Sequence, residues 1–370
     1  MKTSTKNIVI CALFGVFFAV MFLCCVFLPK EEFSYSERRK LVQMQPVTAD
    51  SIKSGKAMTD FESYATDNFP LRDSFRTLKA VTSTYLFRRL DNHNIYLADG
   101  YAAAMEYPMK DASIDHAAER FRNVYDTLLA EKTTNVYLSV IPDKGAFLAE
   151  KSGRLSMDYD EFERLMAEKT GDFASYIGIS DLLELDHYYR TDTHWRQEKI
   201  VDVAQRLAAA MGSAVPDANA HTVNELDHGF HGVYYGQSAL PLPSETIYYL
   251  TNPVIEGCKV YNGEKNNAEM SMYDMALATG YDPYEMFLSG SLSLITIENP
   301  NADNDRHLVL FRDSFGSSIG PLLAEGYAKV TLVDIRYIQP YVLDHFVDFE
   351  GADVLFLYST LVLNNSDTIK

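Results

Sequence analysis

Cysteine is scarce in this sequence, and its distribution excludes a disulfide framework. Three of the four cysteines, Cys11, Cys24 and Cys25, lie in an apolar stretch near the N-terminus, which leaves Cys258 alone in the rest of the chain. The fold must therefore be stabilised by its hydrophobic core. Roughly 340 residues follow the apolar stretch, which is enough for one large domain or for one domain with an insertion.

Positive charge is also in short supply. The chain has 33 Lys and Arg residues against 51 Asp and Glu residues, a formal net charge of -18. Binding to nucleic acid requires a basic surface, so this balance argues against a nucleic-acid partner. It also disfavours a strongly anionic partner, unless the binding site is locally basic.

Charged residues are absent from positions 8–28, which are almost entirely aliphatic, aromatic or cysteine. As a helix this stretch reaches about 30 Å, enough to cross a bilayer core. Lys2 and Lys6 precede it and predict a cytoplasmic N-terminus, although Lys30 and the basic residues at 38–40 weaken that assignment. A cleaved signal peptide is the alternative, but the run is long and lacks an Ala-x-Ala-like site. We expect a signal anchor (residues 1–30) with the rest of the chain outside the cytoplasm.

The remainder of the chain has the pattern of an α/β domain. A polar connector is expected at 31–60, and helical patterns follow at 61–90, broken at 67–70, and at 114–128. Buried strands are expected at 135–141, 307–311, 329–335 and 353–358. Helices that alternate with buried strands predict one sheet with flanking helices over 61–370. A Tyr-rich insertion is expected within it at about 213–304.

Two short segments carry the chemistry. Thr191–Trp195 places Asp192 two residues before His194, and Ser314 follows an apolar run that ends at Phe311. A serine hydroxyl becomes a useful nucleophile when an imidazole takes its proton and a carboxylate orients that imidazole. The apolar spacing from Ile200 to Met211 predicts a helix after the first segment. On spacing alone, Asp192 or Thr193 is therefore more often a helix N-cap.

Together the two segments resemble a known family. The motifs Thr191–Trp195 and Asp313–Phe315 are similar to those of SGNH-type O-acetyltransferases of alginate acetylation and of the related DHHW proteins. The resemblance extends to residues 67–73, 142–144, 189–190 and 333–337, and thus to nearly all of the chain after the apolar stretch. It implies an SGNH-hydrolase-like (flavodoxin-like) parallel sheet with a permuted motif order.

The resemblance also implies roles for individual residues. Ser314 would be the nucleophile, His194 its general base, and Asp192 the residue that orients His194. The backbone N–H of Ser314 and the side chain of Ser291 are candidate oxyanion donors. The supporting residues implied are Arg312, Asp313, Trp195 and Lys144. The chain departs from the family at Thr193 (usually histidine), at Arg312 (usually glycine) and at Ser291 (usually asparagine).

The function implied is a membrane-anchored O-acetyltransferase that acts on a secreted or cell-wall glycan. No cofactor is expected, because a membrane-bound O-acyltransferase partner would supply the acetyl group. A carbohydrate acetyl esterase and a catalytically inactive glycan-binding or assembly protein are the alternatives. The spacing of His221, Asp227, His228 and His231 matches no zinc pattern, so no metal is expected. Tyrosines in the insertion either stack on sugars or, more commonly, lie half-buried in strands; they are Tyr234, Tyr235, Tyr248, Tyr249, Tyr281 and Tyr284.

Overall fold

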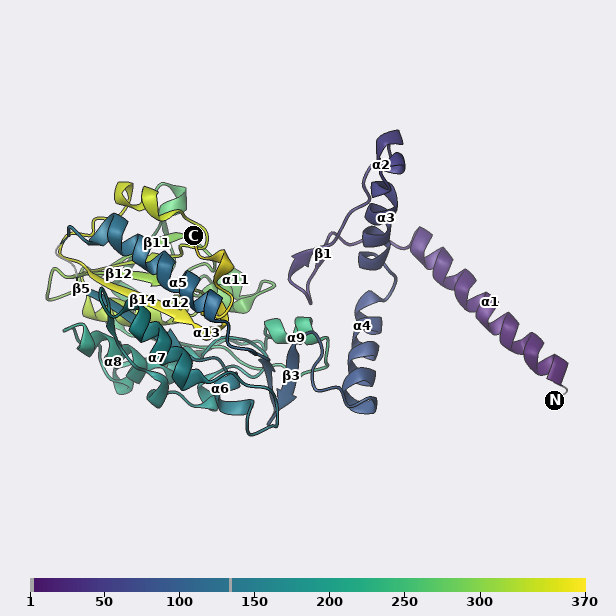
Figure 1. The fold of residues 1–370 in the computed structure, drawn as a ribbon, viewed down its shortest axis with the longest axis horizontal. Coiled ribbons are helices and arrows are strands. Elements are labelled where there is room, and N and C mark those ends of the chain that lie inside the picture. The colour runs from purple at the N-terminus through teal and green to yellow at the C-terminus, as the bar shows by residue number, and fades with distance from the viewer. Residues whose placement is uncertain (1–2, 133–134) are drawn as a thin grey trace. The chain divides into compact units, whose positions relative to one another are not determined.

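The computed structural model describes residues 3–132 and 135–370, so Lys2 lies outside the described residues. The chain forms two compact units. The first comprises Met1–Asn92 and Gly236–Pro241, and the second comprises His93–Tyr235 and Leu242–Lys370. Figure 1 shows the elements of both units, and each unit is described by itself below.

The first unit is mainly helical. Its helix α1 (Thr3–Phe27) includes a 23-residue span, Thr5–Phe27, with a mean hydropathy of 2.9, long and apolar enough to cross a membrane. The predicted apolar helix is thus present, and it fits a membrane anchor or a signal sequence equally well. The other elements are β1 (Phe33–Ser34), β2 (Arg39–Lys40), α2 (Ala49–Lys53), α3 (Lys56–Asp67) and α4 (Arg72–Val81).

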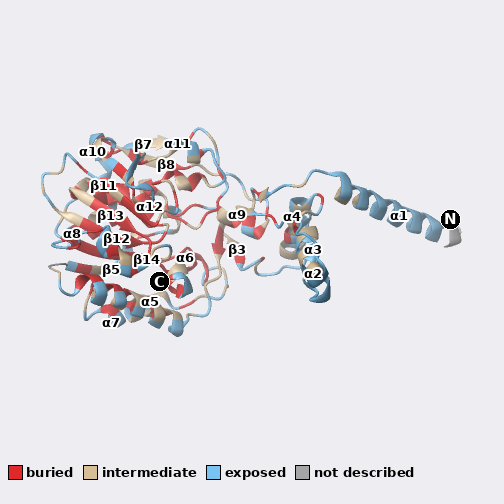
Figure 2. Ribbon diagram, turned by 90° about the horizontal axis from the view of Figure 1, so that it is seen from above, coloured by how far each residue is buried: buried red, intermediate tan, exposed pale blue. Residues whose placement is uncertain are grey.

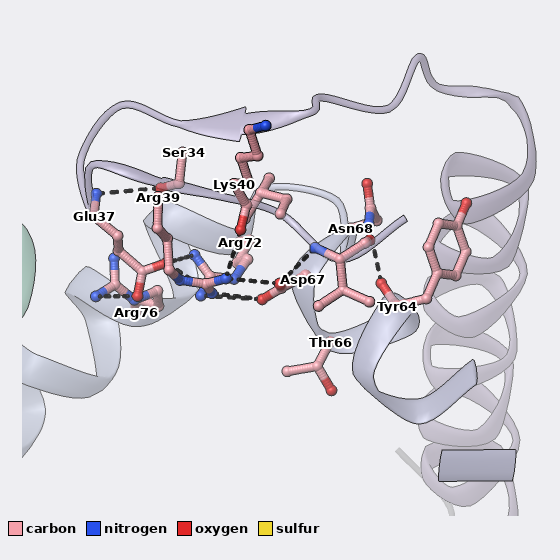
Figure 3. A network of polar contacts seen from close by, with 12 residues as sticks. Ser34, Glu37, Arg39, Lys40, Tyr64, Thr66, Asp67, Asn68, Arg72 and Arg76 are labelled. Carbon is pink, nitrogen blue, oxygen red and sulfur yellow. Dashed lines mark hydrogen bonds and ion pairs between the residues drawn. The ribbon is translucent and has the colours of Figure 1, made fainter. Parts of the chain in front are cut away.

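A network of ion pairs fastens the turn between α3 and α4 to the β1–β2 hairpin (Figure 3). The buried Asp67 carboxylate accepts two hydrogen bonds from Arg39, at 2.6 and 2.8 Å, and one from the Val42 N–H at 2.9 Å. Glu37 pairs with Arg72 at 2.6 Å and with Arg76 at 3.1 Å. The bonds from Arg39 lower the pKa of Asp67 to about 2. We call the five charged residues Glu37, Arg39, Asp67, Arg72 and Arg76 the hairpin–turn cluster.

The second unit contains the central sheet of eight strands, in the order β10-β9-β11-β13-β12-β14-β5-β6. From β13 to β6 every pairing is parallel, whereas β11, β9 and β10 add to the β13 edge in antiparallel fashion. The strands are β5 (Asn135–Ile141), β6 (Ser175–Tyr176), β9 (Lys259–Asn262), β10 (Ala268–Met270), β11 (Leu294–Glu298), β12 (His307–Arg312), β13 (Lys329–Val333) and β14 (Asp353–Ser359).

Helices cover both faces of this sheet, and the buried residues concentrate along its strands (Figure 2). Side chains of β12 alternate between the faces: Leu308 and Leu310 join one core cluster, and Val309 and Phe311 join the other. On the first face lie α8 (Val201–Ala210) and α12 (Gly316–Leu323), and on the second lie α5 (Asp111–Val124) and α7 (Tyr159–Thr170). The predicted α/β class with a mostly parallel sheet is confirmed.

The remaining elements are short. Separate from the central sheet are the hairpin of β3 (Ile95–Ala98) with β4 (Tyr101–Ala104) and the antiparallel pair of β7 (Thr222–Glu225) with β8 (Tyr248–Thr251). The short helices are α6 (Gly145–Leu148), α9 (Val233–Ser238), α10 (Pro253–Gly257), α11 (Met275–Ala278) and α13 (Thr360–Leu363).

The structure divides the chain differently from the sequence prediction at two points. The unit with the sheet begins at His93 rather than at 61. Helices α3 and α4 leave Phe61, Phe75 and Leu78 exposed and, within the described residues, contribute no residue to the core clusters on the sheet. The segment 213–304 is not simply an insertion, because it contributes β9, β10 and β11 to the central sheet. The predicted break at 67–70 coincides with the end of α3.

We predict that the hairpin–turn cluster governs the local stability of the first unit. In Asp67→Ala the Val42 N–H loses its acceptor, so its amide protection should fall about 10- to 100-fold, as for a hydrogen bond to a charged group. Hydrogen exchange with mass spectrometry measures this. Because the pKa of Asp67 lies below its usual value, the wild-type protein keeps this protection above about pH 4 and loses it as the pH falls towards 2.

The matched control is Asp60→Ala on the same helix, where the carboxylate pairs with the exposed Lys56. Protection at Val42 should not change in that variant. Equal loss in both variants, or no loss in Asp67→Ala, would contradict the prediction.

Candidate active site

The site lies where β12 ends. Ser314 occupies the turn between β12 and α12, at the carboxyl edge of the parallel strands, where open α/β sheets place their sites. Ser314 is partly exposed, whereas Phe311, Arg312 and Asp313 before it are buried. The turn therefore leaves Ser314 accessible to solvent and buries the three residues before it.

Asp192 and His194 come from a loop, so the helix N-cap role that spacing alone favoured does not apply to Asp192. Helix α8 begins at Val201, seven residues after His194, and neither Asp192 nor Thr193 caps it. Instead Tyr188 and Trp195 pair as an isolated antiparallel bridge, so the residues between them form a narrow hairpin-like loop. Asp192 stands inside this loop and is fully buried.

The three predicted residues meet in one hydrogen-bonded chain. His194 Nδ1 lies 2.6 Å from Asp192 Oδ1, and His194 Nε2 lies 2.7 Å from Ser314 Oγ. A carboxylate can only accept, so Nδ1 carries the proton and Nε2 is free to accept the proton of Ser314. The arrangement is that of a nucleophile, a base and an orienting acid.

A second segment fixes Asp192 from its other side. Its Oδ2 accepts a hydrogen bond of 2.8 Å from the Val233 N–H, and its Oδ1 also accepts from the His194 N–H at 3.1 Å. Gly232 passes so close that a Cβ there would stand 2.3 Å from the Asp192 Cα. Any larger residue at 232 would therefore displace the carboxylate.

Glu245 holds the residues just before Asp192. Its carboxylate accepts hydrogen bonds of 2.6 Å from the Arg190 and Thr191 N–H groups and a further one from the Thr191 hydroxyl. The same Thr191 Oγ1 accepts from the Gly232 N–H at 2.8 Å. Sequence reasoning missed Val233, Gly232 and Glu245, because no motif marks residues that act through backbone groups.

Lys144 lies beneath the loop rather than on the surface of the site. Its buried Nζ donates to the carbonyl oxygens of Asp192 (2.6 Å), Tyr189 (2.8 Å) and Arg190 (3.4 Å). Burial lowers the pKa of Lys144 to about 7. The residue thus supports the backbone that carries Asp192.

The serine turn is held in a similar way. Asp313 Oδ1 accepts from the Phe315 N–H at 3.0 Å, and Oδ2 accepts from the Ser359 N–H and hydroxyl at 2.8 and 2.6 Å. Trp195 Nε1 lies 3.1 Å from the Phe315 carbonyl oxygen and 2.9 Å from Ser318 Oγ. Trp195 therefore links the histidine loop directly to the serine turn.

Arg312 is fully buried below this turn. Its guanidinium donates to the carbonyl oxygens of Leu292 (3.2 Å) and Asp313 (3.4 Å) and lies 3.9 Å from Asp334. Its side chain fills the space beside Gly316, where a Cβ would stand 2.5 Å from the Arg312 Cβ. The arginine in place of the expected glycine is thus accommodated by packing on Gly316, and its polar contacts are to backbone carbonyls and Asp334 rather than to Ser314.

Ser291 is exposed, in the loop that precedes β11. The neighbouring Leu292 carbonyl accepts from Arg312, but within the described residues the Ser291 hydroxyl makes no hydrogen bond to Ser314. Across the same part of the chain, the Ser314 N–H has no backbone acceptor. The N–H of Ser314 and the hydroxyl of Ser291 both remain candidate oxyanion donors.

Tyr284 supplies a contact with the histidine that the sequence did not reveal. Its ring lies parallel to the His194 ring, with centroids 3.8 Å apart and an interplanar angle of 5°. Its hydroxyl donates to Ser318 Oγ at 2.8 Å, and the same oxygen accepts a hydrogen bond from Trp195 Nε1. Tyr284 is buried, so it faces the histidine rather than a sugar.

The other tyrosines and histidines of interest are dispersed. The Tyr234 hydroxyl lies 3.2 Å from Thr193 Oγ1, Tyr248 and Tyr249 belong to β8, and Tyr281 is exposed. His221 pairs with Glu325, His228 with Asp227, and His231 with the Leu242 carbonyl. Among the described residues one group, Glu184, Asp186 and His187, brings three candidate metal-ligand atoms within 4.8 Å, but such exposed acidic groups are common without a metal.

Comparison with protein families gives a match over part of the chain. Residues 96–231 match a family model described as the SGNH hydrolase-like domain of acetyltransferase AlgX, a range that contains Asp192 and His194. A search of curated proteins gave no match.

Solved structures with the same fold include a DHHW family protein from Eubacterium siraeum and PatB1 from Bacillus cereus. The first is 19% identical with a TM-score of 0.58, and the alignment covers 75% of this chain and 95% of that chain. PatB1 is 19% identical with a TM-score of 0.58, covering 73% of this chain and 96% of that chain. A second PatB1 structure contains a sulfonyl adduct. The predicted resemblance is confirmed, and these structures show that the chain shares their fold.

We predict that the ring of Tyr284 accelerates the reaction of Ser314 with a sulfonyl fluoride. An aromatic pair contributes about 0.5–1.5 kcal/mol, so Tyr284→Leu should slow labelling about 2- to 10-fold because His194 is oriented less firmly. Tyr284→Phe retains the flat face and should react at close to the wild-type rate. Mass spectrometry of the labelled serine measures both rates.

Tyr284→Phe is the matched control, since it removes the hydroxyl that donates to Ser318 Oγ and leaves the ring in place. If Tyr284→Leu reacts as fast as the wild-type protein, the stacked ring has no part in positioning His194.

Proposed function

We propose that this chain is a membrane-anchored O-acetyltransferase with its catalytic unit outside the cytoplasm. It would move an acetyl group through an acyl-serine intermediate to hydroxyls of a secreted or cell-wall glycan. The observation that carries the proposal is the unbroken chain of hydrogen bonds from Asp192 through His194 to Ser314. The match to an acetyltransferase family model supports the acyl group that we assign.

The first half of the reaction loads the serine. His194 Nε2 accepts the hydroxyl proton as Ser314 Oγ attacks the acetyl carbonyl carbon of the donor, and Asp192 stabilises the imidazolium that forms. The carbonyl oxygen becomes an oxyanion, to which the Ser314 N–H donates, with Ser291 as the second candidate donor. The intermediate then collapses. The donor's leaving oxygen takes the proton from Nε2, and the acetyl group stays on Ser314.

The second half transfers the acetyl group to the glycan. Nε2 now accepts the proton of a sugar hydroxyl, whose oxygen attacks the acetyl carbonyl carbon. Collapse of this second intermediate breaks the bond to Ser314 Oγ, which recovers its proton from His194. A partly exposed serine and a buried orienting carboxylate suit this order of steps, because the acceptor can reach Ser314 while Asp192 keeps His194 oriented.

The anchor and the donor complete the proposal. Helix α1 would hold the chain in the membrane with its N-terminus in the cytoplasm. No segment of the sequence resembles a site for coenzyme A or a nucleotide, so the acetyl group would come from a membrane-bound O-acyltransferase partner and no cofactor would be needed.

We predict that the purified full chain transfers acetyl from an activated acetyl ester to an oligosaccharide. Ser314→Ala should abolish transfer, while Ser317→Ala, on the first turn of α12, should leave it unchanged. Mass spectrometry of the sugar and an assay for free acetate together follow the fate of the acetyl group.

Water competes with the sugar hydroxyl for the same acyl-serine, so the products separate the candidate functions. Acetate alone, with no acetylated sugar, would contradict the transferase and identify an esterase. Unchanged glycan acetylation in cells that carry Ser314→Ala would identify an inactive binding or assembly protein.

A further inference from the structure

The turn between α3 and α4 presents apolar side chains to the outside. Phe69 is 40% exposed and Leu71 is 69% exposed, on either side of the buried Pro70. Leu71 has φ 56° and ψ 30°, in the left-handed region that a leucine rarely adopts. Unfavourable backbone geometry of this kind persists only when the surroundings impose it, and it is concentrated at functional surfaces.

The residues around Leu71 impose this backbone geometry. The hairpin–turn cluster holds both ends of the turn, through Asp67 on one side and Arg72 on the other (Figure 3). The Asn68 side chain donates to the Val42 carbonyl oxygen at 2.8 Å, and the rings of Phe69 and Phe75 meet edge to face at 5.6 Å. These contacts therefore hold in place the turn that bears the two exposed apolar side chains.

The turn also lies beside the end of the apolar helix. Lys30 Nζ donates to the Cys25 carbonyl oxygen in the last turn of α1 (2.8 Å) and to the Asn68 carbonyl oxygen (3.4 Å). A cavity of about 360 Å³ lies between them, lined by Leu28 from one side and by Phe69 and Leu71 from the other. When α1 spans a bilayer, its end at Phe27 lies at the level of the lipid headgroups.

We infer that the turn at Phe69–Leu71 is a second membrane contact, with the side chains of Phe69 and Leu71 inserted into the interfacial layer of the leaflet in which α1 ends. This inference rests on the membrane anchoring in the proposed function. Lipid is the occupant because Lys30 ties the turn to the one segment of the described chain that is long and apolar enough to enter it. Apolar side chains gain free energy by entering this layer. The first unit would then be held against the membrane at two points.

Tryptophan fluorescence in lipid vesicles tests this on the full chain. The only native tryptophan, Trp195, is buried in the second unit, so it provides a constant background. Phe69→Trp and Leu71→Trp are reconstituted in phosphatidylcholine–phosphatidylglycerol vesicles with either ordinary or dibrominated acyl chains. The control is Ile52→Trp in α2. Ile52 is 63% exposed, and α3 separates it in sequence from the turn at Phe69–Leu71.

We expect brominated lipid to reduce the fluorescence of both turn variants, and to leave the control and the wild-type protein unchanged. Vesicle flotation distinguishes failure of the anchor from failure of the second contact. A chain that does not float contradicts the membrane anchor and this inference with it. A chain that floats with no quenching at 69 and 71, or with equal quenching at 52, overturns this inference and leaves the membrane anchor standing. In that case the exposed turn would be a surface for a protein partner.

Discussion

The Asp192 carboxylate is the group on which the rest of the site depends. It is fully buried, and its two oxygens have different partners, since Oδ1 orients His194 while Oδ2 is held by the Val233 N–H. Burial of a carboxylate without partners would be costly, so these hydrogen bonds are what allow it to stand inside the loop. Gly232, Glu245 and Lys144 also help to position this carboxylate, since each contacts the backbone around Asp192.

The central sheet supplies the other half of the site. Parallel strand β12 delivers Ser314 to the carboxyl edge, and Asp313 anchors the turn to Ser359 at the end of the neighbouring strand β14. Trp195 joins this turn to the histidine loop through Phe315 and Ser318. The distance of 2.7 Å between His194 Nε2 and Ser314 Oγ is therefore set by the hydrogen bonds that hold the histidine loop and the serine turn.

The sequence predicted the elements whose patterns are local. The strand at 135–141, the helix beginning near residue 200 and the break at 67–70 depend on periodicity and on helix-breaking residues, and all three are present. The motifs also identified Asp192, His194 and Ser314, which the structure brings together. The N-cap role that spacing alone favoured for Asp192 or Thr193 is not observed, because both residues lie in the loop closed by the Tyr188–Trp195 bridge. Val233, Glu245 and Tyr284 could not be predicted, because they act by position in space and no spacing in the sequence reveals a backbone donor or a stacked ring.

The proposed reaction requires Ser314 to carry the acetyl group between donor and acceptor. Mass spectrometry of the full chain after brief exposure to an activated acetyl ester, with peptide mapping to locate the adduct, reveals whether it does. We expect one acetyl group on Ser314 in the wild-type protein, its loss in Ser314→Ala, and its discharge when an acceptor oligosaccharide is added. A wild-type chain that turns over the ester with no acetyl on Ser314, or with the adduct on another residue, would contradict the proposed mechanism.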